Sequence, residues 1–129
     1  MDCFIWTEIV NCGKMSTVSL ESFLRFHPGR SVHVLGTPSD FEQLGSLTKS
    51  PRIIVVDVSS DEMAMDGFRF GHRGTAVLFT NALLQRYATF DRAIHFDSDT
   101  VFKADAVGLV GQALLTSDLV GSRRLDLAY

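Results

Sequence analysis

Apolar runs alternate along the chain with stretches of helical periodicity. Five runs rich in β-branched and aromatic residues predict strands, at positions 2–9, 31–36, 52–58, 92–96 and 118–122. The third run (RIIVVDV) is continuously apolar at its centre, which is the pattern of a strand covered on both faces. These strands are enough for one sheet.

The first predicted helix covers positions 14–26. Its apolar and small side chains recur at a spacing that places five of them on one helical face: Met15, Val18, Ser22, Phe23 and Phe26. Ser16 or Thr17 is expected to cap its start. Pro28 is expected to end it, because a proline disfavours helical geometry in the residue before it. The helix therefore links the first two strands.

Three further helices are predicted at positions 38–47, 74–87 and 105–115. Thr37 is a suitable cap for the first of these helices, with Pro38 at its first helical position. The stretch 59–70 (SSDEMAMDGFRF) is predicted to be a loop, which is acidic at first and then glycine-containing and basic.

The alternation of strands and helices predicts an α/β domain over residues 1–129, with a Rossmann-like, mostly parallel sheet and helices on both faces. Ligands of such sheets bind beyond the carboxyl ends of the strands. Three polar groups are expected to converge there: Thr7 with Glu8, Asp57, and the pair Asp97 and Asp99.

The stretch 92–103 (RAIHFDSDTVFK) places two aspartates directly after a predicted strand. In an extended segment, Asp97 and Asp99 point to the same side, and two close carboxylates repel each other unless a cation or a shared proton intervenes. Their hard oxygen atoms suit Mg²⁺ or Mn²⁺, which commonly bridge carboxylates to substrate phosphates. His95 shares a strand face with Asp97 and is either a partner of this site or a core residue.

Composition excludes several classes of protein. The chain has 129 residues, 46% of them hydrophobic, which fits a single globular domain. Its net charge of −3 gives no electrostatic footprint for nucleic acid. No apolar run reaches the roughly 18 residues of a membrane span. With no visible secretory signal and only two cysteines, a reduced, cytoplasmic setting is expected.

Two stretches resemble the nucleotide-binding half of GT-A glycosyltransferases, in particular the glycogenin-like and lipopolysaccharide-galactosyltransferase-like group (glycosyltransferase family eight). These are FTNALLQRYATFDRAIHFDSDTVF, ending in the D-x-D motif, and FIWTEIVNCGKMSTVSLESFLRFHPGRSVHVLG. The resemblance implies a hexosyltransferase that uses a nucleotide-diphosphate sugar, with a UDP-sugar as the expected donor and Mn²⁺ or Mg²⁺ as cofactor. In that family a later segment carries a further metal ligand and the acceptor pocket. The chain is therefore expected to be either the N-terminal part of a longer catalytic domain or a divergent protein that keeps only the donor half.

The resemblance assigns residues as well. Asp97 and Asp99 would contact the metal and the diphosphate, and Ser98 would lie near the ribose or the donor sugar. Trp6, Thr7 and Glu8 would meet the base and the ribose. The family's phosphate-binding lysine corresponds here to Asn81, so Arg73 is the candidate replacement.

Other assignments rest on the residues alone. Arg73 lies with Arg69 and His72 in a segment that leads into a predicted helix N-terminus, a setting that favours an anion. Asp57 is either a strand-end turn residue or a ribose contact. No catalytic residue and no acceptor are assigned, and an unpaired sheet edge would permit a homodimer.

Two alternatives to an active transferase remain open. The first is an inactive nucleotide-binding or structural domain. The second is a haloacid-dehalogenase-like phosphatase, whose first motif is also a strand followed by D-x-D, with a nucleophilic first aspartate. That motif normally follows the first strand of its fold, whereas Asp97 follows the fourth predicted strand.

Overall fold

The structure is a computed structural model that describes residues 3–70, 76–113 and 115. Its elements in chain order are β1 (Phe4–Glu8), α1 (Lys14–Phe26), β2 (Val32–Gly36), α2 (Pro38–Leu44), the short 3-10 helix η1 (Gly45–Lys49), β3 (Ile53–Asp57), α3 (Glu62–Phe70), α4 (Ala76–Tyr87), β4 (Ala93–His95) and α5 (Ala106–Ala113). The predicted strand at 118–122 lies outside the described residues.

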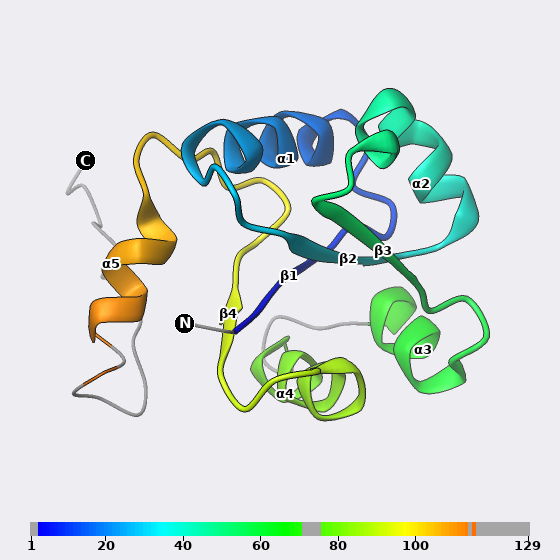
Figure 1. The fold of residues 1–129 in the computed structure, drawn as a ribbon. Helices are drawn as coiled ribbons and strands as arrows, with labels where there is room; N and C mark the ends of the chain where they lie inside the picture. The colour runs from blue at the N-terminus through cyan, green and yellow to red at the C-terminus, as the bar shows by residue number, and fades with distance from the viewer. Residues whose placement is uncertain (1–2, 71–75, 114, 116–129) are drawn as a thin grey trace, which may run out of the picture.

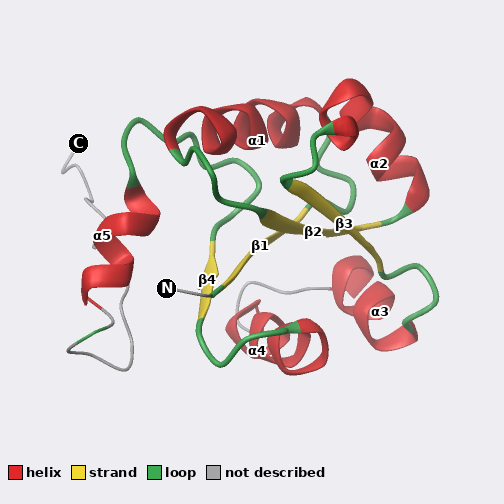
Figure 2. Cartoon of the chain, viewed as in Figure 1, coloured by secondary structure: helices red, strands yellow, loops and turns green. Residues whose placement is uncertain are grey.

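The four strands form one parallel sheet in the order β3-β2-β1-β4. Helices α1 and α2 cover one face of this sheet, and α3 and α4 cover the other (Figures 1 and 2). The prediction of a Rossmann-like α/β fold with helices on both faces is therefore confirmed. None of the described helices is long and apolar enough to cross a lipid bilayer.

Strand β1 supplies both halves of the hydrophobic core because its side chains alternate between the two faces. Ile5 and Ile9 pack in a cluster with Phe23 of α1. Phe4 and Trp6 pack in a second cluster with side chains of α3 and α4. Every residue of β1 from Phe4 to Thr7 is almost fully buried, as expected for a central strand.

Helix α1 begins earlier than its expected caps. It starts at Lys14, so the prediction that Ser16 or Thr17 caps it is wrong. The residue before it is Gly13, whose φ of 61° and ψ of −140° form a backbone conformation that side-chain-bearing residues rarely adopt. The chain therefore enters α1 through a turn that requires glycine rather than through a side-chain cap.

The other end of α1 is held by Arg52, which lies just before β3. Its guanidinium donates hydrogen bonds to the backbone carbonyls of Leu24 (3.0 Å), His27 (2.9 Å) and Arg30 (3.4 Å). These carbonyls belong to the last turn of the helix and the loop beyond it, where no intrahelical donor is present. Arg52 thus fixes the α1–β2 connection against β3.

Helix α2 begins as predicted. The Thr37 hydroxyl accepts from the backbone N–H of Asp40, and the Asp40 carboxylate accepts from the backbone N–H of Thr37. Together they make a complete capping box, with Pro38 at the first helical position.

The segment predicted as a loop at 59–70 contains helix α3, so that prediction is wrong from Glu62 onward. Asp61 accounts for the difference. Its carboxylate accepts hydrogen bonds from the backbone N–H of Ala64 (3.1 Å), from the Tyr87 hydroxyl (2.6 Å) and from Arg86 Nε (2.8 Å). The Tyr87 hydrogen bond holds the pKa of Asp61 below its usual value, and burial and this carboxylate raise the pKa of Tyr87 to about 12. Asp61 therefore starts α3 and ties it to the end of α4.

Strand β3 lies at the edge of the sheet and pairs only with β2 among the described residues. The side chains of Ile54 and Val55 are 39% and 44% exposed. The prediction that this strand is covered on both faces is therefore wrong. A continuous apolar run here reflects an edge strand rather than a central one.

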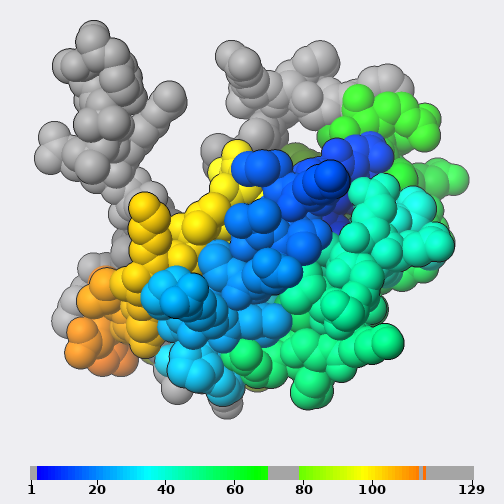
Figure 3. All heavy atoms as spheres, turned by 90° about the horizontal axis from the view of Figure 1, so that it is seen from above, coloured from blue at the N-terminus to red at the C-terminus, as the bar shows by residue number. Residues whose placement is uncertain are grey.

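The chain after β4 packs against α1. The backbone N–H of Phe102 donates to Ser22 Oγ (2.9 Å), and the backbone N–H of Val107 donates to His27 Nε2 (3.2 Å). The Phe102 ring meets the rings of Phe23 and Phe96 edge-on. In Figure 3 this segment (yellow to orange) lies alongside α1 (blue). These contacts fix the segment that follows the D-S-D residues against α1.

Candidate functional site

The order of the strands locates a ligand-binding edge. The chain runs outward from β1 to β2 and β3 with α1 and α2 on one face, then returns through α3 and α4 on the other face to place β4 on the opposite side of β1 (Figure 1). The connections therefore reverse between β1 and β4. In open α/β sheets, ligands bind in the crevice beyond the carboxyl ends of the strands at this reversal.

Three ionisable side chains meet at that point. Glu8 ends β1, His95 ends β4, and Asp97 follows two residues later. The strand register pairs Trp6 with His95, so Glu8 lies level with Asp97. His95 Nε2 lies 2.8 Å from Glu8 Oε2, and one ligand atom from each of the three side chains lies within 4.8 Å of the others. Among the described residues, this is the group that presents such a geometry.

The His95 ring is held by its neighbour on β1. The rings of His95 and Trp6 lie 4.5 Å apart between centroids, with Trp6 1% exposed. The side chains of His95 and Glu8 are each 24% exposed. The pair is therefore partly accessible to solvent, and the buried Trp6 supports the His95 ring. Trp6 is part of the core, and its indole N–H has no hydrogen-bond partner within the described part of the chain.

The D-S-D segment is a tight turn. The backbone N–H of Thr100 donates to the carbonyl of Asp97 (2.9 Å), and Ser98 Oγ donates to Cys12 Sγ (3.0 Å) in the loop after β1. The expectation that Asp97 and Asp99 share one side of an extended segment is therefore wrong. Both carboxylates are exposed, and only Asp97 belongs to the group with Glu8 and His95.

The remaining predicted site residues lie in different settings. Thr7 faces α1 rather than the crevice, because it alternates with Glu8 along β1; it is fully buried, and its hydroxyl has no partner among the described residues. Asp57 ends β3, two strands from β1, so it does not join Glu8 and Asp97 as expected. Its carboxylate accepts from the Ser59 N–H (2.9 Å), and hydrogen bonding with Ser59 lowers its pKa. Arg73 and His72 lie outside the described residues.

The donor set of the group fits a divalent cation. Two carboxylates and one imidazole supply oxygen and nitrogen ligands, and the ionised carboxylates match the charge of a divalent ion. Mn²⁺ accepts such a mixed set, whereas Mg²⁺ prefers oxygen and retains its water. Of the two predicted cofactors, Mn²⁺ is the better match to these side chains.

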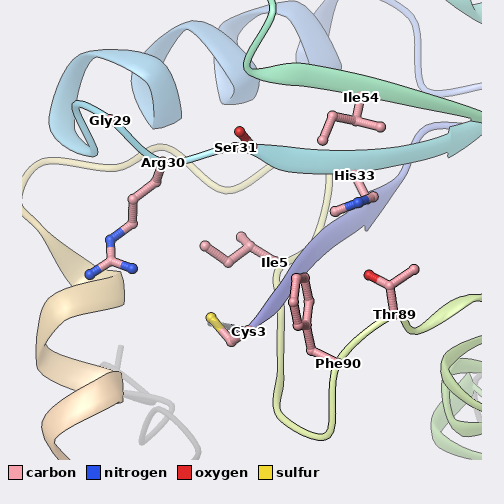
Figure 4. Close-up of a pocket in the computed structure, with 9 residues that line it drawn as sticks. All are labelled: Cys3, Ile5, Gly29, Arg30, Ser31, His33, Ile54, Thr89 and Phe90. Carbon is pink, nitrogen blue, oxygen red and sulfur yellow. The ribbon is translucent and has the colours of Figure 1, made fainter. Parts of the chain in front are cut away.

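A pocket lies at the opposite edge of the sheet from this group. An open pocket of about 380 Å³ is lined by Cys3, Ile5, Arg30, His33, Ile54 and Phe90, among others, at the amino ends of the strands (Figure 4). Burial lowers the pKa of His33 there. This edge is the one that parallel α/β sheets do not use for ligands, so the crevice between β1 and β4 is the stronger candidate.

The sequence predicts a nucleotide contact for Glu8 and a metal contact for Asp97, and it leaves the role of His95 open. The pairing of Glu8 with His95 depends on the register between β1 and β4, which are separated by more than 80 residues of chain. The shared strand face of His95 and Asp97 was the available indication.

Comparison with models of known protein families finds no match, and neither does comparison with curated protein sequences. The fold and the site therefore define the class of this protein: a parallel α/β protein with a candidate cation site at its topological switch point.

Proposed function

We propose that the chain binds a nucleotide-diphosphate sugar together with a divalent cation, as the donor-binding unit of a hexosyltransferase. The observation that supports this proposal is the position of the D-S-D turn. It follows β4 at the carboxyl edge of the sheet, where the connections reverse, with Asp97 beside Glu8 and His95. The resemblance of this segment to family-eight glycosyltransferases supplies the reaction and the donor.

The electrostatics of the turn are consistent with this role. Asp97 and Asp99 are exposed carboxylates that would repel a diphosphate unless a cation lay between them. A bound divalent cation would neutralise charge on the departing nucleoside diphosphate. The side chains of Asp97 and Asp99 would hold that cation, and Ser98 lies between them at the rim of the crevice, where its hydroxyl already bonds Cys12.

Nucleotide binding in the presence and absence of Mn²⁺ tests the proposal. Titration calorimetry with UDP, and with GDP as a comparison, is expected to give one site per chain that requires the metal. Asp97→Asn is expected to abolish this binding, because it removes a charge at the switch point while preserving the shape of the side chain. Asp91→Asn is the matched control, since Asp91 is an exposed aspartate before the amino end of β4.

Transfer itself has a separate readout. Incubation of the chain with Mn²⁺ and a UDP-hexose is expected to release UDP slowly as the hexose is transferred to water or to an added saccharide, and Asp97→Asn is expected to remove this release. If neither UDP nor GDP binds with Mn²⁺ present, the proposal of a nucleotide-sugar function is refuted.

A further inference from the structure

We infer that Glu8, His95 and Asp97 form a transition-metal site that assembles without any nucleotide and selects Mn²⁺ or Zn²⁺ over Mg²⁺. This inference deepens the proposed function, because it names protein ligands for the cation that the D-x-D resemblance does not provide. In this site, Glu8 and His95 from two neighbouring strands are the metal ligands beside Asp97, in place of Asp99.

The three side chains are close to coordinating distances. Ligand atoms around a tetrahedral or octahedral ion with bonds of about 2.1 Å lie roughly 3.0–3.4 Å apart. Glu8 Oε2 and His95 Nε2 are 2.8 Å apart, and the third ligand atom, from Asp97, lies within 4.8 Å of both. Only an adjustment of about 1–2 Å by the exposed Asp97 side chain is needed, which a rotamer change supplies.

Two of the three ligands are rigidly positioned. Glu8 and His95 stand on paired parallel strands, and the His95 ring rests against the buried Trp6. A site built on strands holds its ligands more precisely than one built on a loop. Asp97 begins the D-S-D turn, which the Thr100-to-Asp97 hydrogen bond closes. The geometry therefore exists before any substrate arrives.

The donor atoms set the preference among metals. Imidazole nitrogen suits Mn²⁺ less well than Zn²⁺ and suits Mg²⁺ least, because Mg²⁺ dehydrates reluctantly and favours oxygen. Coordination through Nε2 requires the neutral ring with its proton on Nδ1. The hydrogen bond between His95 and Glu8 is then exchanged for two metal–ligand bonds, and the charge of the two carboxylates balances the ion.

The test uses the intact chain and the metals alone. Titration calorimetry with ZnCl₂, MnCl₂ and MgCl₂ is expected to give one site per chain, with Mg²⁺ at least about tenfold weaker than the other two. Co²⁺ as a spectroscopic substitute is expected to give a visible absorption band that Zn²⁺ displaces. Glu8→Gln and His95→Phe are each expected to weaken Zn²⁺ binding at least about 10- to 100-fold, since losing even an outer-shell partner has that effect.

A folding check and one substitution serve as controls. His95→Phe keeps a ring against Trp6, and its folding is checked by circular dichroism and urea unfolding. Asp91→Asn changes an exposed carboxylate before the amino end of β4 and is expected to leave Zn²⁺ affinity within about twofold. If Asp99→Asn abolishes binding while Glu8→Gln and His95→Phe do not, the inference is overturned. Equal affinity for Mg²⁺ and Zn²⁺ also overturns it.

The outcomes separate this inference from the proposed function. If the metals bind as described but UDP and GDP never do, the metal site stands and the nucleotide-sugar proposal fails. If Mn²⁺-dependent UDP binding persists in Glu8→Gln and His95→Phe but is lost in Asp97→Asn, the nucleotide-sugar proposal stands and the three-ligand site fails.

Discussion

Replacement of His27 tests how the chain after the D-S-D turn is held on α1. His27 is 1% exposed, and its Nδ1 lies 3.0 Å from the carbonyl of Phe23. Its Nε2 accepts the backbone N–H of Val107 at 3.2 Å, so the ring is the neutral tautomer with its proton on Nδ1. His27→Phe preserves the ring, which stacks on Phe23 and meets Phe102 edge-on, and removes both hydrogen bonds.

The two lost bonds differ in cost. The carbonyl of Phe23 still accepts the backbone N–H of His27 at 3.0 Å, so that loss is worth roughly 0.5–1.5 kcal/mol. The N–H of Val107, which is 2% exposed, is left without its partner, at a cost of about 1–3 kcal/mol. The more apolar ring offsets part of this cost. We therefore expect His27→Phe to lower the free energy of unfolding at pH 8 by about 2 kcal/mol, a factor of roughly 30 in the folded-to-unfolded ratio.

The same contacts make the loss depend on pH. Burial lowers the pKa of His27 below its ordinary 6.5, while the bond to Phe23 and the Asp105 carboxylate oppose this shift and Arg30 adds to it. The unfolded chain therefore takes up a proton first as the pH falls below 6.5, and the folded state loses stability until the pH passes the folded pKa. His27→Phe lacks this term, so its deficit relative to wild type is expected to shrink between pH 7.5 and pH 5.

Urea unfolding followed by far-ultraviolet circular dichroism measures the difference at each pH. His33, whose pKa burial also lowers, is present in both proteins and cancels from that difference. Asp105→Asn is the companion variant: it removes the opposing charge but keeps an oxygen for the Gly108 N–H, so its stability is expected to fall more on acidification. A His27→Phe protein as stable as wild type at pH 8, with a deficit that ignores pH, would refute this account of the contact.

Two further substitutions test the packing around the sheet. Arg52→Met is expected to destabilise the chain by about 1–3 kcal/mol, because it removes the Arg52 donor from the Leu24 carbonyl, while the His27 carbonyl still accepts the backbone N–H of Arg30 at 3.1 Å. Urea unfolding measures this cost, and a stability equal to wild type would show that Arg52 is dispensable. Gly67→Ala would add a Cβ that clashes with the Phe79 ring, so overpacking is expected to cost about 1–3 kcal/mol despite the roughly 1 kcal/mol that alanine gains in a helix. A more stable Gly67→Ala protein would contradict the close α3–α4 contact, and Phe79→Leu in the same chain is expected to restore stability.

The order of elements follows from local patterns that the sequence displays directly. Thr37 and Pro38 mark the start of α2, and the bounds predicted for the first helix, 14–26, are those of α1. The face predicted for α1 is wrong, because Met15 and Val18 are exposed and the buried residues are Ser16, Ser19, Leu20 and Phe23. The start of α3 was missed because Gly67 and the acidic residues resemble a loop. The information was present: Asp61 precedes the helix as a cap, and Ala64 and Phe68 have the i, i+4 spacing of a buried face.

Which strands are neighbours in the sheet cannot be predicted from local sequence patterns. An apolar run such as that of β3 is compatible with the centre or the edge of a sheet, because hydrophobicity does not record strand order. Only the tertiary arrangement leaves Ile54 and Val55 partly exposed. The D-S-D segment is likewise held by a contact with Cys12, and Phe102 just after it is held by Ser22 of α1; both partners lie far away in the sequence.

The candidate site shows why a motif alone underdetermines its chemistry. The pair Asp97 and Asp99 suggests an all-oxygen site when read along the chain. Across the sheet, the parallel register brings Glu8 level with Asp97 and sets His95 against Trp6, so Asp97 lies in one group with His95 and with Glu8, which is distant in the sequence. Because His95 adds a nitrogen donor, the metal expected for the Glu8, His95 and Asp97 group differs from the one expected for Asp97 and Asp99 alone. Metal selectivity therefore distinguishes a site formed by the D-S-D motif from one formed across the sheet.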